Sequence, residues 1–497
     1  MSKYSLIIFS AFLMGLSQHP IYLGFFAWIA FIPALYFLED RENFFDFFKA
    51  GIVWGIVYHL TSIFWLSMNI GTNIYIAILT MFLSVIVLTF NTVVIFSFLY
   101  LFKKFYFKKY VYFLPLIWIF IEYVKSYGVL GFPWVSLANT QIDYLILIQN
   151  AELFGIYGIT FWILFFNITL YNYLKSDIIL LSINRKLVFC SFVFFMPWFS
   201  GLVLYKNIKL VDQNQIDIGI VQPNIKLEEK WSGNPNKNFN KVLNLTQKIN
   251  NQNNILIWPE SALPAYFFQS NSYQMNKIYN LLNDSTYLVT GTTVFVKDSL
   301  KNKAYNSIAY IGNNYIKNYY NKIQLVPMAE YVPWSNIFNS LKDLNLGQAN
   351  FSKGEDYTIF NYNQTKFGAV VCYESTFPWI FNEFVNKGAE FMVVVTNDGW
   401  YETAPEPQQH AKQAVYRAIE NRKPIIRCAN TGISMVINAR GDIVEKLELN
   451  KSGVISASII PNTKKTFYNK YEDNFIQLLG LILLIFILKP VFYKHEK

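Results

Sequence analysis

Charged residues are scarce in this chain. Only 15% of its 497 residues are Asp, Glu, Lys or Arg, whereas about a quarter of the residues in an average soluble domain are charged. Hydrophobic residues make up 53% of the chain, and the mean hydropathy is +0.25. They fill positions 4–204, thin out through 205–473 and return at 475–488. This pattern excludes a wholly soluble protein and indicates a membrane protein with a substantial soluble part.

Cysteine is also rare. The three cysteines, Cys190, Cys372 and Cys428, form no disulfide framework, and only the last two lie in the less apolar middle of the chain. Neither an H-E-x-x-H nor a C-x-x-C spacing occurs, so a zinc site has no support. No arginine-rich patch is interleaved with aromatic residues, which argues against a nucleic-acid partner. We expect no metal, no organic cofactor and no nucleic acid.

Cys372 stands at the end of the apolar β-type run "FGAVVCYES" (367–375). A nucleophilic cysteine needs a base or a nearby cation, because a free thiol is mostly protonated at neutral pH. The chain has four histidines, and only His410, on a predicted helix, lies in the middle part. A Cys–His pair therefore rests on one candidate, and a carboxylate base with a lysine is the alternative.

Eight apolar segments are candidates for crossing a membrane. About seven fall within residues 1–205 and one within 471–497, and a bilayer requires roughly 20 residues per helix. Two of the eight, 4–17 and 110–124, are short. The predicted segments are 4–17, 21–38, 50–69, 74–102, 110–124, 151–174, 187–205 and 474–493.

Basic residues are distributed unevenly around these segments. With the N-terminus in the cytoplasm, the short outside loops contain only Lys125. Positive residues favour the cytoplasmic side, so residues 206–470 are predicted to face outward. The thirteen basic residues on the expected inside are Lys3, Arg41, Lys49, Lys103, Lys104, Lys108, Lys109, Lys175, Arg185, Lys186, Lys489, Lys494 and Lys497.

The middle part alternates between β-type and helical patterns. Near-continuous apolar runs separated by helices indicate a sheet buried on its faces. Three runs end in polar residues, at Glu260, at Cys372 and at Asn397-Asp398, and ligands bind at the carboxyl ends of such strands. The predicted strands are 216–222, 255–261, 287–295, 367–374 and 391–398, and the predicted helices are 241–249, 378–388 and 410–422.

Three motifs resemble those of the nitrilase superfamily. They are "IWPES" (257–261), "NKIQLVPMAEYVPW" (321–334) and "VVCYES" (370–375). Together with the membrane segments, the chain resembles the apolipoprotein N-acyltransferase family, a membrane-bound branch of that superfamily. Four further stretches carry this resemblance: "GFPW" (131–134), "VQPNIKLEEKW" (221–231), "TNDGWY" (396–401) and "RAIENRKPIIRCANTG" (417–432).

The resemblance implies a polytopic α-helical membrane protein with an inserted α/β nitrilase-like (αββα sandwich) extracytoplasmic domain. Residues 1–205 would form the membrane domain and 206–470 the periplasmic catalytic domain. Residues 471–497 would add a transmembrane helix and a short cytoplasmic tail, in a bacterial inner membrane.

The resemblance also implies roles for individual residues. Cys372 would be the nucleophile, Glu260 the general base and later acid, and Lys322 the cation that stabilises the oxyanion. Four residues would support them: Glu330 as an auxiliary carboxylate, Tyr373 and Glu374 in shaping the site, and Trp231 on a mobile substrate-facing arm. The chain has Gln324 and Ala329 where many relatives have His and Gly, which leaves the local shape open.

The activity implied is acyl transfer between lipids. A phospholipid, commonly phosphatidylethanolamine, would acylate Cys372, and the thioester would then pass its chain to the α-amino group of a diacylglyceryl-cysteine at the N-terminus of an apolipoprotein. One alternative is a membrane-tethered amidase that hydrolyses a small carbon–nitrogen substrate. Another is a non-catalytic transporter or lipid-binding scaffold.

Simpler explanations exist for the same residues. Cys372 would be a buried structural thiol, since cysteine is among the most buried residue types. Glu260 and Lys322 would form an ordinary ion pair, and Glu330 and Glu374 would be structural carboxylates. In the membrane part, the polar residues Glu122, Glu152, His59 and Asn91 are either functional or, for the two glutamates, interfacial.

Overall fold

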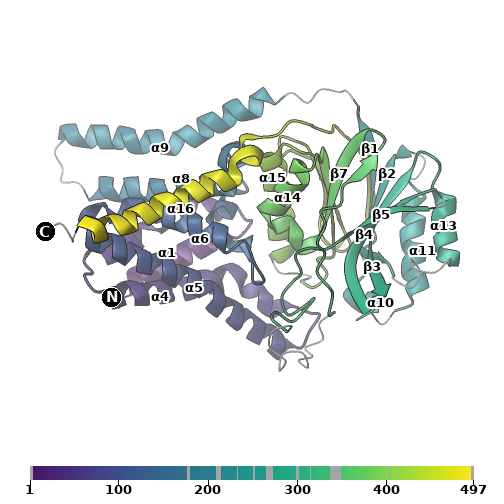
Figure 1. Ribbon diagram of the computed structural model, residues 1–497, viewed down its shortest axis with the longest axis horizontal. Coiled ribbons are helices and arrows are strands. Elements are labelled where there is room, and N and C mark those ends of the chain that lie inside the picture. The colour runs from purple at the N-terminus through teal and green to yellow at the C-terminus, as the bar shows by residue number, and fades with distance from the viewer. Residues whose placement is uncertain are drawn as a thin grey trace. The chain divides into compact units, whose positions relative to one another are not determined.

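The computed structural model divides the chain into two compact units (Figure 1). The first comprises Met1–Asn69, Asn73–Asn207 and Thr466–Lys497, and the second Ile70–Thr72 and Ile208–Lys465. Three lysines used to predict orientation, Lys3, Lys494 and Lys497, lie outside the described residues, as does the side chain of Lys108. The residues described are 4–175, 180–208, 214–231, 233–249, 252–264, 272–297, 302–313, 315–335, 349–401, 403 and 405–493.

The first unit is helical throughout its described residues. Short 3-10 segments, η1 to η5, connect or extend the helices at Leu23–Phe26, Phe64–Met68, Phe107–Phe113, Pro133–Val135 and Leu137–Gln141. Its α-helices are α1 (Ser5–Leu16), α2 (Ala27–Ala30), α3 (Ile32–Glu39), α4 (Phe44–Ile63), α5 (Ile74–Tyr106), α6 (Leu114–Val124), α7 (Leu145–Ile148), α8 (Ala151–Leu174), α9 (Leu180–Asn207) and α16 (Phe467–Tyr493).

Four helices of the described chain are long and apolar enough to cross a membrane. They span Phe44–Met68, Ile74–Tyr106, Ala151–Leu174 and Arg185–Asn207. Shorter apolar helices occupy Ser5–Leu16, Leu23–Glu39 and Asn474–Lys489. These are below the roughly 20 residues that a bilayer requires, so the total of eight spans stays a prediction.

Two predicted spans are less regular than the sequence indicates. Segment 21–38 is divided between η1, α2 and α3, and Phe31 separates the two α-helices. Segment 110–124 contains only the 11-residue helix α6, preceded by η3. In both cases an α-helix starts again at a proline in its first turn, Pro33 or Pro115, because proline lacks the N–H group that a continuing helix needs.

Glu122 is buried inside the first unit and does not take the interfacial position that its sequence place allows. Its carboxylate accepts hydrogen bonds from the Ser136 hydroxyl (2.7 Å), the Leu137 N–H (2.8 Å) and the Thr160 hydroxyl (2.9 Å). These partners come from the segment that follows the "GFPW" motif and from α8. Glu122 therefore holds that segment against two helices, which is a structural role.

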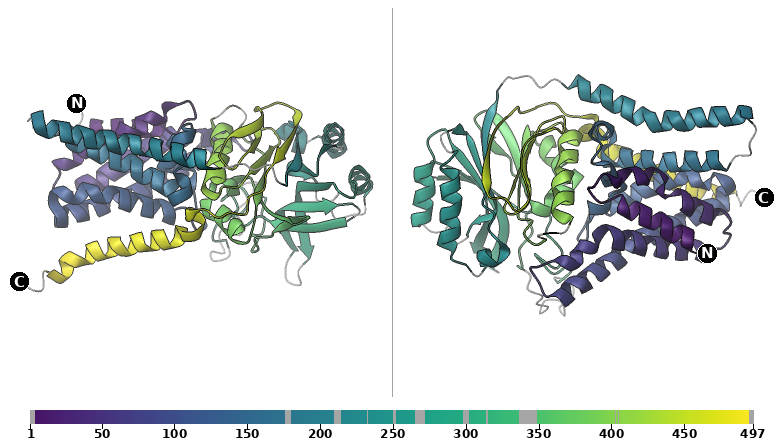
Figure 2. Two further views of the ribbon diagram at one scale, coloured as in Figure 1. Left: turned by 90° about the horizontal axis from the view of Figure 1, so that it is seen from above. Right: turned by 180° about the vertical axis from the view of Figure 1, so that it is seen from behind.

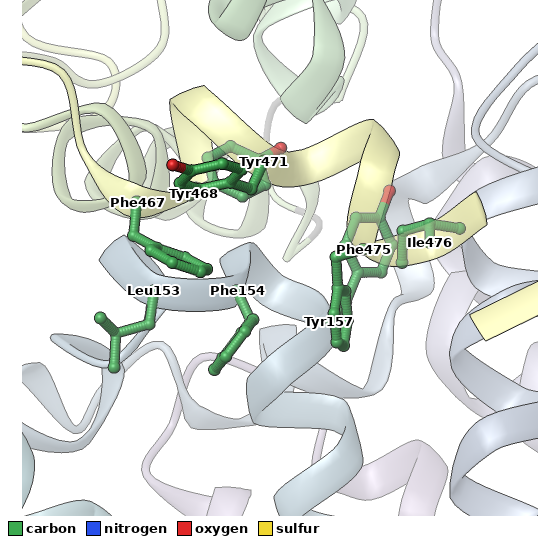
Figure 3. Close-up of a pocket in the computed structure, with 8 residues that line it drawn as sticks. All are labelled: Leu153, Phe154, Tyr157, Phe467, Tyr468, Tyr471, Phe475 and Ile476. Atoms are coloured by element: carbon green, nitrogen blue, oxygen red, sulfur yellow. The ribbon is translucent and has the colours of Figure 1, made fainter. Parts of the chain in front are cut away.

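Helix α8 is interrupted near its start. Gly155 has φ +61°, in the left-handed region, and a Cβ at this position would lie 2.5 Å from the Tyr468 ring of α16. The same turn lines a small aromatic pocket (Figure 3). The pocket is formed by Leu153, Phe154, Tyr157, Phe467, Tyr468, Tyr471, Phe475 and Ile476. Glycine is needed here both for the backbone conformation and for the close approach of α16.

The second unit contains two six-stranded sheets. One has the order β12-β1-β2-β3-β4-β5 and the other β11-β10-β9-β8-β7-β6. The first sheet is built from β1 (Ile216–Gln222), β2 (Ile255–Leu263), β3 (Tyr287–Lys297), β4 (Asn302–Gly312), β5 (Tyr315–Asn321) and β12 (Gly453–Ile459). The second is built from β6 (Phe360–Tyr362), β7 (Thr365–Val371), β8 (Phe391–Thr396), β9 (Ile425–Ala429), β10 (Ser434–Ile437) and β11 (Ile443–Leu447).

The sheets pack face to face between two pairs of helices (Figures 1 and 2). Helices α11 (Pro235–Thr246) and α13 (Tyr273–Leu281) cover the first sheet and bury Val242 and Ile278 in the same core as Trp258 of β2. Helices α14 (Pro378–Asn386) and α15 (Glu406–Asn421) cover the second sheet. The short α10 (Leu227–Trp231) precedes α11. The αββα sandwich predicted for this part of the chain is confirmed.

Parallel pairing directs several strand ends to one edge. Strands β1, β2 and β3 run parallel in the first sheet, and β7, β8 and β9 run parallel in the second. The polar residues that the sequence singles out lie at or near the carboxyl ends of three of these strands: Glu260 in the last part of β2, Cys372 after β7 and Asn397-Asp398 after β8. Because the two sheets stack, residues from both meet at that edge of the sandwich.

The Gly155 turn generates a stability prediction. Gly155→Ala is expected to reduce the free energy of unfolding by ~2–4 kcal/mol, since the added methyl group meets both backbone strain and the Tyr468 ring. The measurement is the melting temperature of the detergent-solubilised full chain. Gly128→Ala is the control, because Gly128 has φ +82° but open space around a Cβ. Equal melting temperatures for the two variants would contradict the packing role.

Candidate active site

Three strand ends supply the predicted catalytic side chains. Glu260 lies in the last part of β2, Lys322 directly follows β5, and Cys372 directly follows β7. Neighbouring strand β3 passes the Glu260 backbone at a glycine, where a Cβ on Gly291 would lie 2.5 Å from the Glu260 Cα. A larger residue at position 291 would therefore displace the backbone that carries the Glu260 carboxyl group.

Cys372 occupies a strained turn. Its φ is +51°, in the left-handed region that a non-glycine residue rarely adopts, and it begins the short 3-10 helix η8 (Cys372–Thr376). Burial and the negative charge of Glu260 raise the pKa of its thiol well above the usual range, while the charge of Lys322 opposes the shift. The resting thiol is therefore protonated and requires a base to become a nucleophile.

Glu260 is suited to that role. Burial raises the pKa of its carboxyl group, the charge of Lys322 opposes this shift, and the charge of Glu330 adds to it. Oε1 accepts a hydrogen bond from the Asn306 side chain at 2.9 Å, whereas buried Oε2 has no hydrogen-bond partner in the described part of the chain. A carboxylate with a raised pKa and one open oxygen can accept a proton from a neighbouring group.

Lys322 is paired with Glu330 and not with Glu260. Its buried Nζ lies 3.0 Å from Glu330 Oε1 and 2.8 Å from Glu330 Oε2. Burial alone would lower the pKa of Lys322, but the carboxylates of Glu330 and Glu260 outweigh this effect and raise it above its usual value. The ammonium group thus stays charged, and the simple Glu260–Lys322 pair considered from the sequence is not the arrangement found.

Asn306 of β4 joins the two carboxylates and was missed by the sequence analysis. Its Nδ2 donates to Glu260 Oε1 and to Glu330 Oε1, at 2.9 Å in each case, and its backbone carbonyl accepts from the Lys322 backbone N–H at 2.8 Å. The remaining Glu330 oxygen accepts from the Val326 N–H at 2.7 Å. No motif marks Asn306, because its role depends on strand pairing between β4 and β5.

Lys230 is a second cation that the sequence analysis missed, although it lies within the quoted motif "VQPNIKLEEKW". Its Nζ donates to the Glu260 carbonyl oxygen at 3.2 Å. Burial lowers the pKa of Lys230 to about 8, while the charges of Glu260 and Cys372 oppose this shift. The site therefore contains one lysine whose pKa is raised, Lys322, and one whose pKa is lowered, Lys230.

Glu374 connects the segments that carry Lys322 and Cys372. Its buried carboxylate accepts from the Val371 N–H at 2.8 Å, the Ile323 N–H at 2.7 Å, the Gln324 N–H at 3.0 Å and the Tyr320 hydroxyl at 2.7 Å. Four donors leave this carboxylate no capacity to bind another group strongly. Its position indicates that Glu374 is a structural brace, which holds the Lys322 segment against the Cys372 segment.

Tyr373 and Trp231 are the two remaining residues that the resemblance places in the site. The Tyr373 side chain is buried and packs edge-on against Phe377, with ring centroids 4.9 Å apart. Trp231 is the last residue of α10, and its side chain lies outside the described residues. Its predicted place on a substrate-facing arm stays a prediction.

His410, on α15, is buried next to the backbone of Cys372. Its Nδ1 lies 2.9 Å from Asp398 Oδ1, and the other Asp398 oxygen lies 2.6 Å from the Arg427 guanidinium. Its Nε2 faces the Cys372 carbonyl oxygen at 3.1 Å. His410 is therefore a buried residue of α15 whose two ring nitrogens both face oxygen atoms.

Potential metal ligands also gather here, since single ligand atoms of Cys372, Asp398 and His410 lie within 4.8 Å of one another. Both oxygens of Asp398 are already bound, one by Arg427 and the other by His410 and by the Thr396 hydroxyl at 2.9 Å. The adjacent guanidinium charge opposes a second cation. The donor set therefore fits an internal ion pair better than a metal centre.

Cys428, the other cysteine of this unit, is fully buried in β9. Its thiol lies 3.4 Å from the carbonyl oxygens of Val221 and Ile257, and burial raises its pKa above the usual value. Among the two thiols, only Cys372 is partly exposed and adjacent to a base and a cation. A partly exposed thiol, a carboxylate with a raised pKa and an ammonium group paired with Glu330 together suit nucleophilic attack on a carbonyl carbon.

Comparisons with known proteins agree with the motifs. Residues 217–466, about half of the chain, match the carbon-nitrogen hydrolase family, and residues 10–169 match the apolipoprotein N-acyltransferase N-terminal domain. The resemblance inferred from the sequence is confirmed, as is the fold class of a helical membrane part with an inserted nitrilase-like domain.

Individual relatives cover nearly the whole chain. The apolipoprotein N-acyltransferase of Chlorobaculum tepidum is 28% identical over 95% of this chain and 93% of its own. That of Geobacter metallireducens is 29% identical over 95% and 92%. Among solved structures, Saccharomyces cerevisiae Nit3, of the nitrilase superfamily, matches at 18% identity and a TM-score of 0.39, covering 53% of this chain and 94% of Nit3.

The Glu374 brace generates a stability prediction. Glu374→Gln is expected to lower the free energy of unfolding by ~2–4 kcal/mol, because an amide N–H₂ group would face a buried donor. Thermal unfolding of the full chain in detergent measures the effect. Glu383→Gln, at an exposed position on α14, is the control and is expected to change little. Matching melting temperatures would show that Glu374 braces nothing.

Proposed function

Because this chain belongs to the carbon-nitrogen hydrolase family and combines that domain with the N-terminal domain of apolipoprotein N-acyltransferases, we propose that it acylates lipoproteins. The donor is a phospholipid, with phosphatidylethanolamine as the main source. The acceptor is the α-amino group of the diacylglyceryl-cysteine at the N-terminus of an apolipoprotein.

In the first half-reaction, Glu260 removes the thiol proton of Cys372, and the sulfur attacks the ester carbonyl carbon of the phospholipid. The ammonium group of Lys322 stabilises the oxyanion that develops. The C–O bond then breaks, Glu260 returns the proton to the glycerol oxygen, and a lysophospholipid leaves. The product is a thioester on Cys372.

In the second half-reaction, the acceptor amine attacks the thioester carbonyl carbon. Glu260 accepts a proton from the amine, the C–S bond breaks, and the proton returns to the sulfur. The amide is formed and the free thiol is regenerated. No other energy source is needed, since a thioester is a reactive acyl donor toward an amine.

One observation supports this proposal above the others: a partly exposed thiol lies beside a carboxylate with a raised pKa and a lysine whose charge Glu330 maintains. Glu330 holds Lys322 in position, while Tyr373 and Glu374 shape the turn around the nucleophile. Trp231 is assigned to a substrate-facing arm by the family resemblance alone.

The apolar helices of the first unit favour a lipid substrate over a small amide. Four helices long enough to cross a bilayer serve no purpose in hydrolysing a soluble carbon–nitrogen compound, whereas both lipid substrates reside in a membrane. The distribution of basic residues supports a bacterial inner-membrane location, multiple passes and a catalytic domain on the periplasmic side.

Intact mass spectrometry tests the proposed chemistry. The full chain incubated with phosphatidylethanolamine is expected to gain one acyl chain, and a diacylated lipopeptide should then discharge it as N-acylated peptide. Cys372→Ser should gain no thioester, while Cys428→Ser should behave like the natural chain. If the natural chain gains no acyl group and acylates no peptide, the proposal is wrong. Release of free fatty acid without peptide acylation would support the amidase alternative.

The pH dependence of acylation follows from Glu260. A general base must be deprotonated, so the rate of thioester formation should fall as the pH drops through the raised pKa of Glu260. The midpoint of this limb is expected above 4.5, the ordinary value for a glutamate. Glu260→Gln should reduce the rate by about a hundredfold or more and abolish the limb. Glu383→Gln is the control, and an unchanged limb in Glu260→Gln would refute the assignment.

A further inference from the structure

The conformation of Cys372 requires support from its surroundings. A left-handed φ of +51° is unfavourable for a cysteine, and such conformations persist only where neighbouring contacts determine them. In this turn, the Cys372 carbonyl oxygen accepts a hydrogen bond from the Ser375 hydroxyl at 2.8 Å. It also lies 3.1 Å from His410 Nε2. Ser375 Oγ and His410 Nε2 are themselves 2.9 Å apart, so the three groups form a compact triangle.

The His410 ring is in turn held rigidly. Arg427 lies 2.6 Å from Asp398 Oδ2, and Thr396 donates to Asp398 Oδ1 at 2.9 Å. Burial alone would raise the pKa of Asp398, but Arg427 and His410 lower it well below its usual range. An ionised Asp398 accepts only, so His410 Nδ1 carries the hydrogen of their 2.9 Å contact. The Cys372 carbonyl oxygen, 3.1 Å from Nε2, also only accepts, so this contact needs a second hydrogen, on Nε2. The ring that makes both contacts is the imidazolium form, which the charge of Asp398 favours, whereas burial and the charge of Arg427 lower the pKa of His410. That contact sets the orientation in which Nε2 faces Cys372.

The Asp398 carboxylate is closely surrounded by the neighbouring backbone. Gly432 passes so close that a Cβ there would lie 1.9 Å from Asp398 Oδ2. Asp398, His410 and Arg427 are all buried, with 3%, 1% and 0% of their surfaces exposed. They come from the end of β8, from α15 and from β9. The orientation of the ring is therefore set by three separate elements of the second sheet and its covering helix.

His410 does not occupy the position of a base for the thiol. Its Nε2 contacts the carbonyl oxygen and the Ser375 hydroxyl of η8, while Nδ1 is turned to Asp398. A ring nitrogen also lies within 4.8 Å of the Cys372 sulfur, but both ring nitrogens already face oxygen atoms. The Cys–His alternative left open by the sequence is thus replaced by a different role for the same histidine.

We propose that His410 is a positioning residue for Cys372: held by Asp398 and Arg427, it binds the carbonyl of the nucleophile's own residue and maintains the left-handed turn that aims the thiol. The inference rests on the proposed acyl transfer for its kinetic consequences. Without the ring, Glu260 and Lys322 stay in place, but the Cys372 backbone relaxes and its sulfur moves away from them. A displacement of about 1 Å at a reacting atom can reduce a rate by a hundredfold.

Three variants of the full chain in detergent test this role. His410→Ala removes the contact to the Cys372 carbonyl, and His410→Gln replaces the ring with an amide whose Nε2 can still donate to it. Ser375→Ala is a milder change that removes one hydrogen bond from the same triangle and should fold even if His410→Ala does not. Gln413→Ala is the control, since Gln413 is buried on α15 one turn from His410.

The readouts are single-turnover thioester formation from phosphatidylethanolamine at varied concentration, and the melting temperature. His410→Ala should lower the saturating rate by about a hundredfold and leave the half-saturating lipid concentration unchanged. His410→Gln should stay within about tenfold of the natural chain, and Ser375→Ala should lose about five- to tenfold. The control should match the natural chain in rate.

Several results would overturn the inference. One is a natural rate in His410→Ala, or in Ser375→Ala if the first does not fold. Another is a His410→Gln variant that melts at the same temperature as the natural chain but is as inactive as His410→Ala. That result would assign the ring nitrogen to proton transfer. If the natural chain forms no thioester, the proposed function fails instead. The alkylation rate of Cys372 by iodoacetamide then tests positioning alone, with His410→Ala expected to differ from the natural chain and His410→Gln to resemble it.

Discussion

The buried contact between Lys322 and Glu330 is the interaction on which the site depends. Removing two charged groups from water is costly, and such a pair is stable only when each charge keeps its partner and the remaining hydrogen-bonding positions are filled. Here Asn306 and the Val326 N–H fill them on Glu330. The pair keeps an ammonium group charged next to a thiol that burial would otherwise leave inert. Burial lowers the pKa of Lys322, and Glu330 is the largest of the nearby charges that raise it.

The carboxylates of this site differ in function because their surroundings differ. Glu330 and Glu374 accept from several donors each, and both are thereby committed to holding neighbouring segments. Glu260 retains one oxygen without a hydrogen-bond partner in the described chain, and its pKa is raised. Environment and not residue type thus separates the proposed proton carrier, Glu260, from the other two carboxylates. The family resemblance assigns these three residues different roles, and their surroundings give a physical reason for the difference.

The nucleophile is held from two sides. On one side are Glu260 and Lys322, which come from the first sheet and which we propose act on the thiol. On the other are Ser375 and the His410–Asp398–Arg427 network, which contact the Cys372 backbone and come from the second sheet and its helices. Stacking the two sheets brings these sets together at the end of β7. The membrane unit, with its apolar helices and aromatic contacts, is consistent with substrates that reside in a bilayer.

Composition and periodicity were sufficient for the broad organisation. The boundaries predicted for β1 agree with the structure. The predicted ranges also begin or end within a few residues of β2, β3, β8, α14 and α15. The agreement is good because buried parallel strands and amphipathic helices have strong local patterns. Strands β4 and β5 were not predicted. They pair antiparallel at the edge of the sheet and have many polar residues on one side, so local hydrophobicity marks them weakly.

The sequence by itself determined the membrane character and the α/β middle part. It also singled out the candidate thiol, carboxylate and lysine, Cys372, Glu260 and Lys322. Each of these features is marked by residues close together in the chain. Only the tertiary structure decided that Lys322 pairs with Glu330, that Asn306 joins two carboxylates, that Lys230 approaches Glu260 and that His410 lies behind Cys372. Each of these contacts joins residues from different strands or helices. Their formation depends on sheet register and on burial, and neither is encoded in any short stretch of sequence.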